Sequence, residues 1–189
     1  MLGPKSALKK ISLIILLTAS FAFKSQAILV LKLADLNTMA LKSDVVMHGY
    51  VGEQQSEIDQ WGRVVTISKV EVIDALYGVK TGEVISLYQV GGSKDGVIAP
   101  IIGGQHYQVG QEIIFFGLKA GLNFVSFGAG QGKLDIESQA GRDMIREDIG
   151  DAVAFDSQNK VYRPSPLTFN NVDILKSEIR SMLQQRSDK

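Results

Sequence analysis

The two histidines of the chain, His48 and His106, are its clearest candidates for metal binding or acid–base chemistry. Zinc in a protein is usually held by three or four side chains, so both histidines would need nearby acids to complete a site. The sequence leaves open a metal-binding protein or a hydrolase-type enzyme built on these residues. It favours ordinary barrel or surface histidines, because no ligand spacing joins the two, and it predicts no metal and no cofactor.

A group of acidic residues after residue 140 is the next candidate for cation binding. Its members are Asp143, Glu147, Asp148 and Asp151. A calcium-binding loop places its oxygen ligands at alternating positions around a central glycine, and this group lacks that spacing. We therefore expect these carboxylates to form a solvated face.

Two glycine-containing segments have a partial likeness to catalytic or phosphate-binding motifs. Residues 93–96 (SKDG) offer a serine and a base but lack the Gly-x-Ser-x-Gly turn that strains a nucleophile, so Asp95-Gly96 indicates a turn. Residues 128–132 (GAGQG) lack the Gly-Lys-Ser/Thr ending of a phosphate loop and are interpreted as a strand connection. No catalytic residue is predicted, and the chain is predicted not to be an enzyme.

The N-terminal segment has the order of a secretory signal peptide. Residues 1–10 contain lysines and no acidic residue, residues 11–23 form an apolar run, and Ala27 ends a cleavage motif of small residues. As a helix this run spans about 20 Å, whereas the hydrocarbon core of a membrane is about 30 Å thick. We expect cleavage between Ala27 and Ile28 and export to the periplasm or the extracellular space. The alternative is an uncleaved N-terminal anchor, which is the one membrane contact expected.

The charge balance after the predicted cleavage point argues against nucleic acid as a partner. All 20 acidic residues but only 16 of the 20 basic residues follow residue 27, so residues 28–189 carry a net charge of −4. A basic patch that would bind nucleic acid is therefore not indicated. Because the chain has no cysteine, its fold rests on a hydrophobic core, and the length of residues 28–189 suits a single domain. The sequence does not indicate an oligomeric state.

Alternating apolar residues and glycine turns predict a β-rich fold. The clearest strand covers residues 63–76, with one face formed by Val64, Thr66, Ser68, Val70 and Val72. Further strands are expected over residues 44–51, 83–90, 112–118, 122–127 and 133–137, a hairpin over 152–155 and 160–163, loops over 52–62 and 91–110, and a helical turn or two within 139–149.

Two helices are expected at the ends of this β-rich region. Asp35 is the expected N-cap of a helix over residues 35–42, and Asn171 that of a helix over residues 172–185. The second helix has an apolar stripe made of Val172, Leu175, Ile179, Met182 and Leu183. The predicted fold is mainly β: a five- to six-stranded OB-like barrel with a short N-terminal helix and a C-terminal helix packed on it. A two-sheet sandwich is the alternative.

Residues 43–136 resemble an uncharacterised family of small exported bacterial proteins. The positions that carry the pattern are Asp44, Gly49, Gly78, Gly110, Glu112, Gln131 and Gly132. In outline the pattern is also similar to the netrin and tissue-inhibitor-of-metalloproteinase modules, which are OB-type barrels. That resemblance implies a protein-binding or inhibitory role. The inhibitors bind protease zinc through an N-terminal cysteine, whereas this chain would begin at Ile28, so no inhibitory residue is carried over.

These observations predict an exported, non-enzymatic binding module with an unidentified protein partner. The expected contact is the loop over residues 91–110, because loops on a rigid barrel commonly carry recognition. Its candidate residues are Gly91, Gly92, Gly103, Gly104, His106 and Tyr107. A structural component of the cell envelope is a further alternative.

Overall fold

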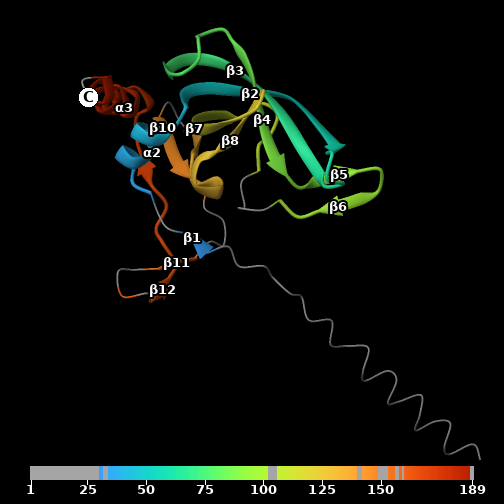
Figure 1. Cartoon of the computed structure of the whole chain (residues 1–189). Helices are drawn as coiled ribbons and strands as arrows, with labels where there is room; N and C mark the ends of the chain where they lie inside the picture. The colour runs from blue at the N-terminus through green and yellow to red at the C-terminus, as the bar shows by residue number, and fades with distance from the viewer. Residues whose placement is uncertain are drawn as a thin grey trace, which may run out of the picture.

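The computed structural model describes residues 30–31, 34–101, 106–139, 142–148, 153–155, 158 and 160–187. The predicted signal peptide with its cleavage point at Ala27 and Ile28 lies outside these residues, as do Gly103, Gly104 and Asp151. The described part is mainly β (Figure 1). Neither of its helices combines the length and the apolar character that a membrane span requires.

Five strands form a ring at the centre of the molecule. They are β2 (Val45–Ile58), β3 (Val64–Tyr77), β4 (Val84–Val90), β7 (Glu112–Ala120) and β8 (Asn123–Ser126). The neighbours run β7-β2-β3-β4-β8, and β8 pairs again with β7. Because β4 and β8 meet in parallel at a single residue pair, Leu87 with Phe124, the ring is barrel-like but not closed. This arrangement confirms the OB-like barrel and not the two-sheet sandwich.

The sheet continues beyond the ring from the outer edge of β7. It adds β9 (Lys133–Gln139), β10 (Arg142–Glu147) and β13 (Thr168–Phe169). The predicted helical turn within residues 139–149 is wrong, because β10 pairs along its whole length with β9. Ile145 lies opposite Ile136 in that pairing and is fully buried, so tertiary packing outweighs the weak local helix signal.

The predicted loop over residues 52–62 is also wrong in its larger part. Strand β2 continues to Ile58 and pairs with β3 from Gln54 opposite Ser68 to Ile58 opposite Val64. Only residues 59–63 turn the chain. The residues in this part of β2 are mostly polar, and none of their side chains is fully buried. The segment therefore lacks the apolar alternation by which a half-buried strand is recognised from sequence.

Five further short strands of the described residues lie outside the large sheet, as two hairpins and one added strand. Strands β5 (Gly92–Lys94) and β6 (Val97–Ala99) form a hairpin inside the predicted loop over residues 91–110. Strands β11 (Val153–Phe155) and β12 (Val161–Tyr162) confirm the predicted C-terminal hairpin, and β1 (Val30–Leu31) pairs in parallel with β11. Figure 1 shows this small sheet below the barrel.

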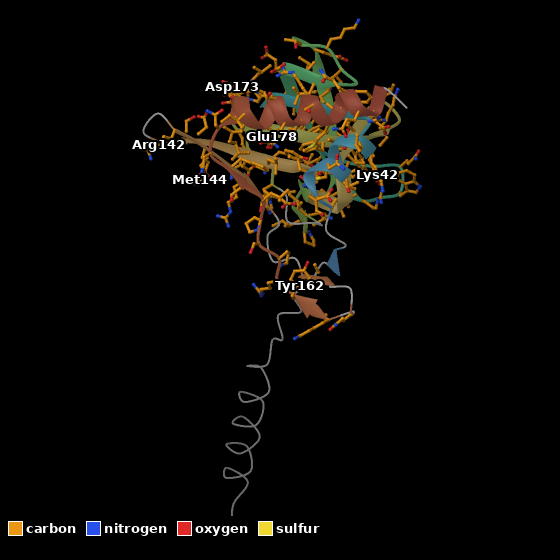
Figure 2. All side chains as sticks on the ribbon, turned by 90° about the vertical axis from the view of Figure 1, so that its left-hand side faces the viewer. Lys42, Arg142, Met144, Tyr162, Asp173 and Glu178 are labelled. Carbon is orange, nitrogen blue, oxygen red and sulfur yellow. The ribbon has the colours of Figure 1, made fainter. Side chains whose placement is uncertain are left out.

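Both predicted helix starts are confirmed. The N–H of Thr38 donates to the Asp35 carboxylate at 2.6 Å before α2 (Leu36–Lys42). The N–H of Ile174 donates to Asn171 Oδ1 at 2.9 Å at the start of α3 (Val172–Ser187). Figure 2 shows α3 lying across one face of the sheet, with Asp173 and Glu178 on the helix and Tyr162 in the separate small sheet.

Two hydrophobic cores lie on opposite faces of the sheet. The helix-side core joins the apolar stripe of α3 to α2 and the sheet, and includes Leu36, Met39, Val46, Ile114, Phe116, Leu134, Ile145, Leu175 and Ile179. This packing confirms the expected role of the α3 stripe. The barrel core fills the ring and includes Val45, Met47, Val70, Val72, Leu87, Tyr107, Ile113 and Phe115. A short 3₁₀ helix, η1 (Phe127–Gly130), connects β8 to β9.

Candidate functional site

The strongest candidate for a recognition surface is a projection that we call the arm. It consists of residues 54–68 of the β2–β3 hairpin together with the β5–β6 hairpin, which contacts both of those strands. In Figure 1 the arm extends to the right of the barrel, with β5 and β6 below the ends of β2 and β3. Its large exposed apolar side chains are Ile58, Trp61, Val97 and Ile98.

The base of the β5–β6 hairpin is fixed to strand β3 through Gly91 and Gly92. The N–H of Gly91 donates to the carbonyl of Val64 at 2.9 Å, and the Thr66 hydroxyl donates to the carbonyl of Gly91 at 2.8 Å. Gly92 has a positive φ of 127°, and a Cβ there would overlap the Thr66 hydroxyl. Glycine is therefore required at this position for both backbone conformation and close approach.

The tip of the β5–β6 hairpin presents apolar side chains to solvent. Asp95 and Gly96 both have positive φ values and form the predicted turn, whereas Ser93 lies in strand β5 and not on a strained nucleophile turn. Val97 is 55% exposed and Ile98 is 82% exposed. An apolar strand with this exposure on a fixed base is suited to contact with another molecule.

The turn between β2 and β3 is organised around one carboxylate, that of Asp59. Its Oδ1 accepts hydrogen bonds from the N–H groups of Trp61 and Arg63, both at 2.9 Å. Its Oδ2 accepts from Arg63 Nε at 2.8 Å and from the Tyr88 hydroxyl at 3.0 Å. This cluster is not among the sites predicted from the sequence, although an aspartate placed before a turn glycine is the usual signal of a side chain that caps its own turn.

These hydrogen bonds set the acidity of Asp59. Burial acts to raise the pKa of Asp59, but the hydrogen bonds from Arg63, Tyr88 and Trp61 outweigh it and lower the pKa to about 2. The pKa of a free aspartate is near 3.9, so the pKa of Asp59 is lower in the folded chain than in the unfolded chain. The ionised Asp59 carboxylate therefore stabilises the fold above about pH 4, and this stabilisation is lost as the pH falls toward 2.

We therefore expect the wild-type chain to lose more stability between pH 4 and pH 2 than Asp59→Asn, which has no carboxyl to protonate there. Thermal unfolding midpoints recorded across that range measure the difference. Parallel pH profiles for the two proteins would contradict this assignment. The exposed Asp95, on the β5–β6 turn, provides the matched control Asp95→Asn.

The two histidines lie on different faces of the sheet. His48 is buried, its Nε2 lies 2.6 Å from Glu112 Oε1, and its partner across the strands, Ile114, belongs to the helix-side core. His106 is exposed, and its carbonyl accepts a hydrogen bond at 2.6 Å from Lys133, which reaches it from the barrel side. Within the described residues no group of three or more His, Cys, Asp or Glu side chains is placed to hold a metal ion.

A buried lysine lies on β9, beside the barrel core. Lys133 and Asp135 lie opposite the barrel-core residues Phe115 and Ile113, and Lys133 is fully buried. Lys133 Nζ is 2.9 Å from Asp135 Oδ1 and 3.9 Å from Asp148 Oδ2. Burial raises the pKa of Asp135 even though the Lys133 ammonium group acts to lower it.

Tyr107 packs beside this ion pair and corrects one expectation about the loop over residues 91–110. Its ring is buried, lies 5.3 Å from Lys133 Nζ and packs edge-on against Phe115. Burial also raises the pKa of its hydroxyl. The carbonyl of Tyr107 accepts a hydrogen bond from Gln54 at 2.8 Å. The side chain therefore belongs to the barrel core and is not available to a partner.

The acidic group after residue 140 is only partly a solvated face. Asp143 is partly exposed and accepts a hydrogen bond from the Ser138 hydroxyl at 2.7 Å. Glu147 is buried, and its Oε2 accepts from the N–H of Leu167 at 3.1 Å. Burial raises the pKa of Glu147. The expectation is wrong for Glu147 because β10, which was not predicted, turns this side chain inward.

The residues that carry the family resemblance have structural roles here. Asp44 Oδ2 accepts from the N–H of Lys119 at 2.8 Å, and Gln131 accepts from the N–H of Ala34 at 2.7 Å and donates to Gly128 at 3.1 Å. The remaining positions are Glu112, paired with His48; Gly49, Gly78 and Gly132, where a Cβ would crowd neighbouring atoms; and Gly110, which has a positive φ. The pattern therefore describes the fold.

Comparison with protein-family models, with curated proteins and with solved structures finds no match for this chain. The geometry of the arm is thus the main basis for a functional assignment.

Proposed function

We propose that this protein is an exported, non-enzymatic protein-binding module whose β5–β6 hairpin contacts the partner. The observation that carries the proposal is the exposure of Val97 and Ile98 on a hairpin whose base is fixed to strand β3. The order of charged, apolar and small residues in the first 27 positions supports export.

The physical advantage of this surface is its preorganisation. A partner that binds a fixed hairpin does not have to offset the entropy of ordering it, so more of the contact energy appears as affinity. Complete burial of a valine or isoleucine side chain contributes about 1.5–3 kcal/mol. Val97 and Ile98 together can therefore supply a useful part of the binding free energy, provided that the partner offers an apolar surface.

Site-specific photo-crosslinking tests the proposal. A photoreactive residue is introduced in place of Ile98 in one protein and in place of Leu122 in another. Leu122 is a matched control because it is 97% exposed but lies on the β7–β8 turn, away from the β5–β6 hairpin. In cells of the source organism we expect one discrete protein adduct from position 98 and none from position 122.

A second variant shows whether the apolar side chains supply the affinity. The double substitution Val97→Ser and Ile98→Ser should reduce recovery of the crosslinked partner at least about tenfold, which corresponds to 1.4 kcal/mol. Equal adducts from positions 98 and 122, or full recovery by the double variant, would contradict the proposed role of the hairpin. Removal of residues 91–110 as a whole is unsuitable, since it also deletes Tyr107 from the barrel core.

A further inference from the structure

Trp61 is the only tryptophan in the chain and lies in the turn between β2 and β3. Its side chain is 68% exposed. Burial of an aromatic ring of this size would remove a large apolar surface from water, so an exposed tryptophan is a candidate binding contact. Trp61 has no role in either hydrophobic core.

The turn that carries Trp61 is unusually well fixed. The Asp59 carboxylate accepts hydrogen bonds from the N–H groups of Trp61 and Arg63, and Tyr88 links the same carboxylate to strand β4. The Arg63 guanidinium lies 4.8 Å from the centre of the Trp61 ring and also donates to the Tyr88 hydroxyl at 3.0 Å. The ring is therefore presented on a rigid support with one face covered by Arg63.

The chemistry around the ring indicates which class of ligand fits it. Asp59 lies 2.7 Å from Arg63, so the charge of the arginine is compensated and an anionic ligand gains little. The residues beside Trp61 in the turn, Gln60 and Gly62, are exposed and are not apolar. A surface with one aromatic face and polar edges suits a ligand that is itself flat, neutral, apolar on its faces and polar at its rim.

We propose that Trp61 is a carbohydrate-binding platform for neutral, extended glycan chains. The C–H groups on one face of a sugar ring pack on the face of Trp61 opposite Arg63, and the sugar hydroxyls at the rim reach the polar turn residues. A platform at the tip of an arm accepts the middle of an extended chain. This site goes beyond the proposed protein contact, because it uses the β2–β3 turn and not Val97 or Ile98 of the β5–β6 hairpin.

The single tryptophan makes the test direct. The full chain is titrated with cellohexaose and chitohexaose while the emission of Trp61 is recorded, with single-stranded oligothymidylate as an anionic stacking control. We expect at least one hexasaccharide to produce a saturable shift of the emission to shorter wavelength. The oligothymidylate is expected to produce none.

Calorimetric titrations of variants assign the binding to the ring. Trp61→Ala should weaken glycan binding at least about tenfold, whereas Trp61→Phe should retain a part of it. Both substitutions change an exposed side chain, and their thermal unfolding midpoints should match that of the wild type. Ile98→Ser should bind the glycan as the wild type does, which separates this site from the β5–β6 hairpin.

Three outcomes would overturn the proposal. The first is the absence of an emission shift with both hexasaccharides. The second is unchanged glycan affinity in Trp61→Ala. The third is a shift with oligothymidylate as large as that with the glycans, which would assign the platform to nucleobases.

Discussion

Replacing Lys133 with alanine is expected to lower the free energy of unfolding by about 3–5 kcal/mol, because the partly buried carboxylate of Asp135 is left without its nearest cation. Lys133 is fully buried, 2.9 Å from Asp135, and its ammonium group also donates to the His106 carbonyl at 2.6 Å. The substitution therefore removes both the charge partner of Asp135 and the contact that holds residues 106–107 against the barrel. Urea denaturation at neutral pH measures the loss.

A paired substitution provides the control for this prediction. Lys133→Met with Asp135→Asn removes both charges while a side chain of similar length still packs beside Tyr107. Exchange of a buried ion pair for less polar groups of similar volume is often close to neutral, so most of the stability should return. A loss below about 1 kcal/mol for Lys133→Ala would show that the pair contributes little, as exposed pairs do.

The stability that the Lys133–Asp135 pair contributes depends on pH. Burial raises the pKa of Asp135, so the folded chain binds this proton more tightly than the unfolded chain does. Stability from this group is therefore greatest at low pH and decreases as the pH rises through the folded-state pKa. Removal of the Lys133 ammonium group should raise that pKa further, and the Lys133→Ala protein should lose more stability toward neutral pH than the wild type.

Replacing Gly78 with alanine is expected to destabilise the fold by about 2–5 kcal/mol, through a left-handed backbone and a steric overlap together. Gly78 has a φ of 77° in the β3–β4 turn. A Cβ at this position would overlap the carbonyl oxygen of Asp44 and lie 3.3 Å from Val45 Cα. Those atoms begin β2, so the turn could relax only by moving the strand that starts the ring.

The same turn offers a closely matched control. Gly82 has a φ of 81°, but a Cβ there would meet no atom within 4 Å. Gly82→Ala should therefore cost only about 1–2 kcal/mol, the backbone part of the effect. Thermal and denaturant unfolding of the two variants separate the contributions, and equal losses would show that the contact with Asp44 is unimportant.

Several elements could be predicted because their signals are local. The alternation along β3 correctly placed Val64, Val70 and Val72 on one buried face. The two helix starts depend on a side chain and an N–H only three residues away. The apolar stripe of α3 needs no knowledge of its neighbour, because a helix with one apolar face must bury it against something.

Other elements could not be predicted because their partners lie elsewhere in the chain. Strand β10 and the outer half of β2 form by hydrogen bonding to another strand, and neither has a strong apolar alternation of its own. The proposed recognition surface divides in the same way. A contact within residues 91–110 is proposed from its glycines, whereas Trp61 is a candidate only because Asp59 and Tyr88 fix its turn in the folded chain.

The sequence by itself determined a barrel-type β fold, its flanking helices and the turn at Asp95-Gly96, since periodicity, capping and left-handed backbone conformations act over a few residues. Only the tertiary structure decided that Lys133 is inside and Trp61 is outside. A lysine becomes buried when other groups compensate its charge, and here Asp135 does so together with the carbonyl of His106, which lies 27 residues away in the chain. A tryptophan stays exposed when no neighbouring element covers its turn.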